Sequence, residues 1–148
     1  DTFYSMRRHL LDGNSTILDV EVGTLIYGSG KSIHKSFRDF TFCVEPYLNN
    51  PQNELLYFGD LDFEGIIIYE NLYKDFKDNV NIKPFCVAYE KMLDKANVAQ
   101  LPYMKKGQSI NISNIFLSYF SLSRQEQIKN ILFQSRYIPQ EILQRKDF

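Results

Sequence analysis

The segment from Leu55 to Tyr69 constrains the fold more than any other part of the chain. It opens with the apolar run Leu-Leu-Tyr-Phe (55–58), which is typical of a buried strand, and the run stops at Gly59. Asp60 and Asp62 follow at once, and apolar residues at helical spacing come after them. The pattern predicts a strand, an acidic turn and a helix. In α/β sheets, ligands bind beyond the carboxyl ends of the strands, so we expect the functional site at this turn.

Asp60 and Asp62 occupy alternate positions and therefore point the same way if the backbone is extended, with Cα atoms roughly 6.5 to 7 Å apart. Carboxylates converging to about 5 Å repel by roughly 3 kcal/mol at an effective dielectric constant of about 20. A hard divalent cation, Mg²⁺ or Mn²⁺, offsets that repulsion and also bridges to phosphate. Glu64, in the first turn of the expected helix, is a secondary catalytic candidate.

The same residues have a second interpretation, a plain strand-to-helix turn. Asp is favoured at helix N-caps, so Asp62 fits as the cap of a helix that starts near Phe63, with Asp60 simply solvated. Glu64 then only complements the helix dipole. The pattern alone leaves both interpretations open.

Size and composition favour one globular domain. The chain has 148 residues, of which 44% are hydrophobic and 15% aromatic, enough for a packed core. It has no apolar run long enough to span a membrane and no secretory signal, so we expect no membrane association and a cytoplasmic location. Cys43 and Cys86 lie in apolar surroundings without CxxC spacing, which predicts reduced core cysteines.

The rest of the chain alternates between strand and helix patterns as far as residue 101, which predicts a parallel sheet flanked by helices. Beyond it the pattern is helical, and we expect a tail that packs on the core. The expected elements are helices at 2–11, 32–44, 65–76, 90–98, 112–120, 124–134 and after Pro139, with strand character at 16–27, 55–58 and 82–89.

A glycine turn precedes a modest basic face. Gly28 and Gly30 open the segment that carries Lys31, His34 and Lys35, which we regard as candidate contacts for a nucleic-acid phosphate. A solvated helix face explains these charges equally well, and the formal net charge of −1 gives no support to strong non-specific DNA binding. The Gly-Lys-Ser sequence at 30–32 is no P-loop, because a strand residue occupies the place of its first glycine.

The segment Gly-Asp-Leu-Asp-Phe-Glu-Gly (59–65) resembles the DxD motif of Toprim domains, which topoisomerases, bacterial primases and several nucleases share. The nearest likeness is to the carboxyl-terminal Toprim domain of the JetD family of Wadjet defence nucleases, with type IIB topoisomerase A subunits as distant kin. Residues 1–6, 24–31 and 136–143 also resemble parts of these relatives, although only the acidic turn is specific. The resemblance implies a Toprim-like (Rossmann-like) core at 1–101 and a helical tail at 102–148.

The same resemblance implies metal-dependent cleavage of DNA by Asp60, Asp62 and Glu64, in an anti-plasmid defence system with condensin-like partners, and a homodimer. In the family a Glu at the end of the first strand completes the metal site. This chain begins just after that point, so we expect a fragment that lacks its first strand, or a site without its third carboxylate. Glu21 and Glu45 are poor substitutes by position.

Two other functions compete with the nuclease. A Toprim-like module without catalysis would serve DNA docking or protein assembly, and the absent Glu favours it. A phosphoacceptor or small-molecule α/β domain also carries acids at strand ends, but Lys91 is a poor match for the lysine that such receivers need. Fold analogy alone does not separate these functions.

Overall fold

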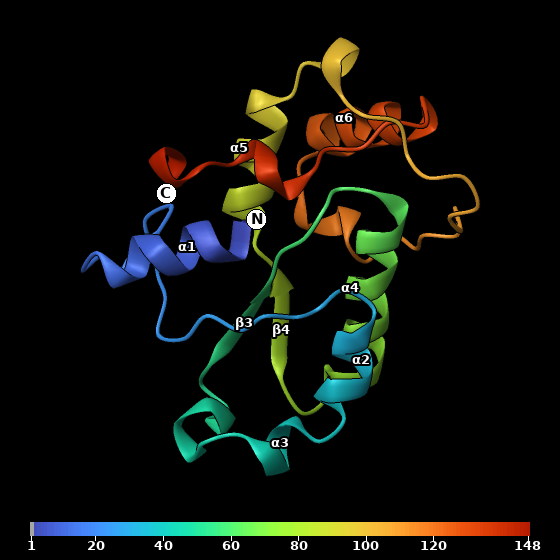
Figure 1. Cartoon of the computed structure of the whole chain (residues 1–148). Helices are drawn as coiled ribbons and strands as arrows, with labels where there is room; N and C mark the ends of the chain where they lie inside the picture. Colours follow the sequence, from blue (N-terminus) through green and yellow to red (C-terminus); the bar gives the residue numbers. More distant parts are fainter. Residues whose placement is uncertain (1) are drawn as a thin grey trace.

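A strand, a helix and a second strand form the centre of the fold. The computed structural model describes residues 2–148, and in it β3 (Glu54–Tyr57) leads through the acidic turn into α4 (Phe63–Phe76), which returns to β4 (Asn81–Pro84). The two strands are parallel, in a register that pairs Glu54 with Asn81 and Tyr57 with Pro84. Figure 1 shows α4 beside this two-stranded sheet. The expected parallel pairing is confirmed, but it involves two strands only.

The other elements surround this unit in a mixed α/β arrangement, with six α-helices within residues 2–148. A short antiparallel hairpin joins β1 to β2. No helix in the described part of the chain is both long and apolar enough to cross a membrane. The remaining elements are α1 (Thr2–Leu11), β1 (Thr16–Ile17), β2 (Val20–Glu21), α2 (Ser32–Phe37), α3 (Phe40–Cys43), α5 (Cys86–Lys95) and α6 (Leu122–Phe133), with 3₁₀ turns η1 (Pro46–Asn49), η2 (Val98–Gln100), η3 (Leu117–Tyr119), η4 (Gln140–Ile142) and η5 (Arg145–Asp147).

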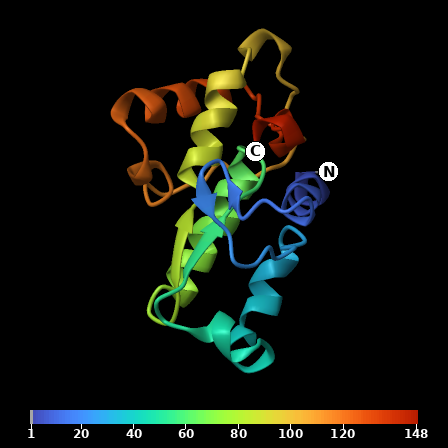
Figure 2. The ribbon, with the colours of Figure 1, turned by 90° about the vertical axis from the view of Figure 1, so that its left-hand side faces the viewer.

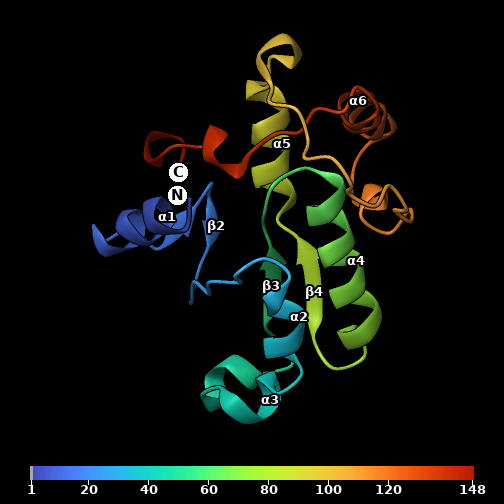
Figure 3. The ribbon, with the colours of Figure 1, turned by 45° about the vertical axis from the view of Figure 1, so that its right-hand side comes forward.

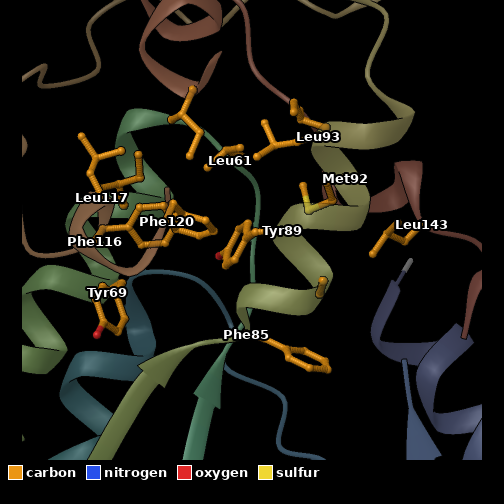
Figure 4. Packing of buried hydrophobic residues seen from close by; sticks show 14 of the residues in the cluster. Leu61, Tyr69, Phe85, Tyr89, Met92, Leu93, Phe116, Leu117, Phe120 and Leu143 are labelled. Atoms are coloured by element: carbon orange, nitrogen blue, oxygen red, sulfur yellow. The ribbon is translucent and has the colours of Figure 1, made fainter. Parts of the chain in front are cut away.

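An aromatic cluster joins α4 and α5 to the segment before α6. Tyr89 on α5 packs edge-on against Phe116, with ring centroids 5.1 Å apart, and Phe116 also contacts Tyr69 on α4 at 5.7 Å and Phe120 at 5.3 Å. Figure 4 shows these rings beneath the acidic turn, with Leu61 above them. Each fully buried side chain of this size contributes roughly 1.5–3 kcal/mol. This cluster gives the acidic turn a rigid support.

The two ends of the described chain lie together, on the side of the molecule away from α4 (Figures 2 and 3). The ring of His9 on α1 lies 6.1 Å from that of Phe148, and Arg145 pairs with Asp12. The last segment therefore runs back across the top of the sheet towards α1. This path brings residues 138–141 over the acidic turn.

Several expectations for the first half were wrong. The strand character at 16–27 is confined to the β1–β2 hairpin, which turns through Leu18 and Asp19 at positive φ, and residues 24–27 form no strand. The helix expected at 32–44 is two short helices, because the chain breaks between Phe37 and Phe40. Those two rings stack with centroids 4.7 Å apart, so the break is fixed by packing.

Four further expectations need correction. The strand expected at 82–89 ends at Pro84, and α5 begins at Cys86 instead. The helix expected at 112–120 is irregular apart from η3, and the last helix, after Pro139, is a single 3₁₀ turn. Both cysteines are free, as expected, but Cys43 is exposed and Cys86 only half-buried, so Cys43 is not a core residue.

The division into a core at 1–101 and a tail at 102–148 stays a prediction. Phe116, Ile128 and Ile138 from the second part belong to the same hydrophobic cluster as Met92 and Leu61 from the first. The tail thus supplies part of the common core.

Candidate metal site

The acidic turn, residues 59–62, is held in place by contacts from three other segments. The N–H of Gly59 donates to the phenol oxygen of Tyr89 at 3.1 Å. Leu61 and Ile138 exchange two backbone hydrogen bonds, of 2.9 and 3.2 Å, in an isolated antiparallel bridge. Tyr57 donates from its hydroxyl to the carbonyl of Gly65 at 3.0 Å, which ties β3 to the start of α4. Hydrogen bonds from α5 and from the segment around Ile138 therefore fix the backbone of the acidic turn.

Asp62 is the N-cap of α4, as the second sequence interpretation predicted. Its Oδ1 accepts the N–H of Gly65 at 2.6 Å, and its Oδ2 accepts Nε2 of Gln108 at 2.7 Å. The residue is only 8% exposed. Both carboxylate oxygens thus have protein donors, one from the helix and one from a distant side chain.

Gly65 has a steric reason to be glycine. A Cβ at this position would lie well inside 3.0 Å of the backbone oxygen of Asp60, a separation that real Cβ atoms essentially never show, and 3.2 Å from Oδ1 of Asp62. The acidic turn folds back so closely over the first turn of α4 that no side chain fits between them. The spacing of Gly65 from the two aspartates is thereby explained by packing.

Asp60 is half-buried, which corrects the alternative in which it is simply solvated. Burial raises the pKa of Asp60, and the nearby charges of Glu141 and Asp62 raise it further. The N–H of Gln140, which donates to Oδ1 at 2.9 Å, and the charge of Lys105 act in the opposite direction on this pKa. Ionised Asp60 is therefore under-compensated by the groups around it.

The acidic surroundings also affect two tyrosines. Burial, and then the charges of Asp62 and Asp60, raise the pKa of Tyr57. The pKa of Tyr137 is raised by burial and by the same two aspartates together with Glu141. Negative charge is thus concentrated at this end of β3.

Glu64 and the predicted phosphate contacts lie along α2 and α4. Glu64 forms an ion pair with Lys31 at 3.0 Å, and His34 contacts Asp75 at 2.7 Å. Lys35 is exposed on α2. Lys31 therefore lies beside the first turn of α4, next to the acidic turn. His34, on α2, contacts the other end of α4.

Gly28 and Gly30 lie before α2, and Gly30 adopts a positive φ of 59°. The N–H groups that follow this glycine turn are used internally, because Ser32 bonds to the carbonyl of Ser29 and Ile33 to that of Gly30. These two N–H groups are therefore not available to a phosphate at this turn.

The donor set fits a divalent cation in part. Two carboxylates share one turn, and Oδ2 of Asp60 has no protein donor within residues 2–148. In the described part of the chain, however, no three His, Cys, Asp or Glu side chains stand close enough together to hold a metal ion. Within residues 2–148, neither Glu21 nor Glu45 completes the pair, so a cation here would also take carbonyl, water or phosphate oxygens.

Several residues of this site carry no signal in the sequence. Gln108 lies in a polar loop with no distinctive pattern, and nothing in the sequence indicates that its amide reaches residue 62. Gln140 and Glu141 lie in a segment singled out only by resemblance. In the sequence, Tyr57 and Tyr89 are typical core aromatic residues. Their hydroxyl groups form hydrogen bonds with Gly65 and Gly59, and only the three-dimensional contacts show this.

Comparisons with known proteins give no relative for this chain. No protein-family model matches it, and neither the curated proteins nor the solved structures contain a significant match.

Proposed function

We propose that the acidic turn binds Mg²⁺ or Mn²⁺ through Asp60 and Asp62, and that the chain serves metal-dependent cleavage of DNA phosphodiester bonds. One observation carries the proposal: two shielded carboxylates share the turn after β3, and the surroundings of Asp60 raise its pKa. Burial and a neighbouring like charge both disfavour an ionised carboxylate, and a bound cation relieves both effects. No cationic side chain pairs with either aspartate within residues 2–148.

The residues of the site have distinct roles in this proposal. Asp60 offers its unbonded Oδ2 to the cation, and Asp62 offers Oδ2 when Gln108 withdraws. A bound divalent cation supplies Lewis-acid polarisation of the scissile phosphate. Glu64 orients a water molecule, and Lys31, held beside it by their ion pair, contacts a phosphate oxygen of the DNA backbone.

The finer fold assignment belongs to the same proposal. A parallel β3–α4–β4 unit with acids at the carboxyl end of its first strand supports a Toprim-like arrangement. A role as the nuclease component of an anti-plasmid defence system, with condensin-like partners and a homodimeric state, rests on the resemblance of residues 59–65 alone.

A non-catalytic module is the second candidate, and a specific observation favours it. Three of the four oxygens of Asp60 and Asp62 already accept protein hydrogen bonds, and no third carboxylate joins them in the described residues. In that case the turn is structural, and the chain docks DNA or assembles with another protein without cutting.

Calorimetric titration with Mn²⁺ tests the metal site directly. We expect binding by the wild-type chain and none by the Asp60→Asn/Asp62→Asn double variant. The matched control is Asp39→Asn/Asp78→Asn, which removes the same charge from two exposed aspartates, one just before α3 and one after the end of α4. Binding that survives in the acidic-turn variant would contradict the metal site.

Incubation with supercoiled plasmid DNA then separates the two candidates. Nicking or linearisation that needs Mn²⁺ or Mg²⁺ and disappears in Asp60→Asn/Asp62→Asn supports the nuclease. Metal binding without any cleavage, together with retained DNA binding in a gel-shift assay, would favour the non-catalytic module.

A further inference from the structure

The segment that carries Gln108 crosses the acidic turn as a strap, defined as residues 105–112. Firm backbone contacts hold it at both ends: Met104 donates to the carbonyl of Ser135 at 2.8 Å, and Ser113 donates to Glu70 at 2.7 Å. The strap contains no helix or strand. Within residues 2–148, the bond from Gln108 to Asp62 is its only hydrogen bond to another part of the molecule.

This bond occupies the oxygen of Asp62 that a cation needs. Oδ1 caps α4 through Gly65, so Oδ2 is the oxygen available without breaking the helix end. The amide N–H₂ of Gln108 points its positive end at Oδ2 and covers a residue that is only 8% exposed. A cation that approaches the lone pair used by Gln108 would have to displace the amide, because the cation also needs room for its own waters.

One hydrogen-bond acceptor of the closed strap is also left unpaired. Oε1 of Gln108 is enclosed and has no hydrogen-bond partner in the described residues, whereas water would pair with it if the strap opened. An unpaired buried acceptor is unfavourable, and this offsets part of what the bond to Asp62 contributes. The contact is therefore suited to being exchanged rather than to being permanent.

We propose that Gln108 gates the acidic turn: the Gln108–Asp62 hydrogen bond and cation binding at Asp60 and Asp62 exclude each other. The inference rests on the proposed function, since it regulates that same site. Cation binding releases the strap, and Lys105 and Lys106, exposed on it, move away with Gln108. The apparent affinity for the cation is then the intrinsic affinity multiplied by the fraction of molecules in which the strap is open.

Mn²⁺ calorimetry on Gln108→Ala tests the gate. If the strap is closed in about nine molecules of ten, removing the amide raises the apparent Mn²⁺ affinity roughly tenfold. Asn111→Ala is the matched control, because Asn111 is exposed on the same strap and its side chain makes no hydrogen bond to any residue from 2 to 148. We expect this control to bind as the wild type does.

Trypsin cleavage after Lys105 and Lys106, followed by mass spectrometry, gives an independent readout. In the wild type, Mn²⁺ accelerates these cuts, whereas Gln108→Ala is cut rapidly with or without Mn²⁺. Asp60→Asn/Asp62→Asn shows no response to Mn²⁺, and a short lysine peptide controls for effects on trypsin itself.

The outcomes separate the gate from the metal site. Equal affinities in wild type and Gln108→Ala, without Mn²⁺-dependent cutting, would overturn the gate and leave the metal site standing. Binding by Gln108→Ala alone would support the gate in its strongest form. An absence of binding in every variant would overturn both.

Discussion

Glu70 lies on α4 and Asp62 caps that helix, but different kinds of hydrogen-bond donor hold their carboxylates. Glu70, about two turns beyond Asp62, is 2% exposed and accepts the backbone N–H groups of Ser113 at 2.7 Å and Phe116 at 3.3 Å. At the acidic turn, Asp62 relies for its second oxygen on a side chain from a strap. Backbone donors leave only when the chain unfolds locally, whereas a side-chain donor swings away. The hydrogen bonds of Glu70 are therefore a permanent part of the fold, whereas the bond of Gln108 to Asp62 can be exchanged for another partner.

The largest effect is expected from Glu70→Ala. It leaves two enclosed backbone N–H groups without acceptors, at about 1–3 kcal/mol each, so we expect a loss of about 3 kcal/mol in the free energy of unfolding. Urea denaturation measures it. Glu126→Ala, at an exposed site on α6, should change stability by less than about 0.5 kcal/mol. A loss below about 1 kcal/mol for Glu70→Ala would break the contrast between the regions.

Gly65→Ala should come next. The added Cβ meets the backbone of Asp60, so the acidic turn must shift, and we expect a loss of about 2 kcal/mol despite the better helix propensity of Ala. Gly23→Ala is the control, since a Cβ there meets nothing within 4 Å. A stability equal to that of the wild type would mean that the backbone of the acidic turn can shift at little cost in free energy.

Asp62→Ala should cost about 1–2 kcal/mol, the usual value of a helix N-cap, and Asp62→Asn less, because Asn also caps. Asp39→Ala at the start of α3 provides a matched comparison, as Asp39 makes no side-chain cap bond and should be close to neutral. Thermal unfolding without metal measures all three. Equal losses at both positions would show that the cap bond of Asp62 contributes nothing.

The smallest effect belongs to the Lys31–Glu64 ion pair. Its side chains are 73% and 41% exposed, so Lys31→Ala should lower stability by no more than about 0.5 kcal/mol, and the difference should vanish near 1 M salt. Lys35→Ala is the control for loss of an exposed charge from α2. A larger, salt-insensitive loss would place Lys31 among the structural contacts instead.

Local pattern predicted the acidic turn well and the long-range contacts poorly. Residues 54–76 follow from sequence because strand, cap and helix each depend on near neighbours. The helix expected at 112–120 fails because Glu70 captures the N–H groups of Ser113 and Phe116, a contact that no periodicity reveals.

The remaining errors have the same origin. Residues 24–27 have strand-like composition, but no strand in the described part of the chain pairs with them, and Ile26 and Tyr27 are 44% and 62% exposed. In the stretch after Pro84, Ala88, Tyr89 and Met92 pack inward at helical spacing, and this packing prevails over the β propensity of Phe85 and Val87. At the site, Asp60 and Asp62 were identifiable from sequence, whereas Gln108 and Gln140 were not.

The bridge between Leu61 and Ile138 also determines when the site is completed during protein synthesis. The N–H that bonds Asp60 belongs to Gln140, eighty positions later in the chain. At 5–20 residues per second, a ribosome needs roughly 4–16 s to travel that distance. During this interval the nascent strand and helix carry their aspartates without the segment that covers them, so the acidic turn is completed only after Gln140 has been synthesised.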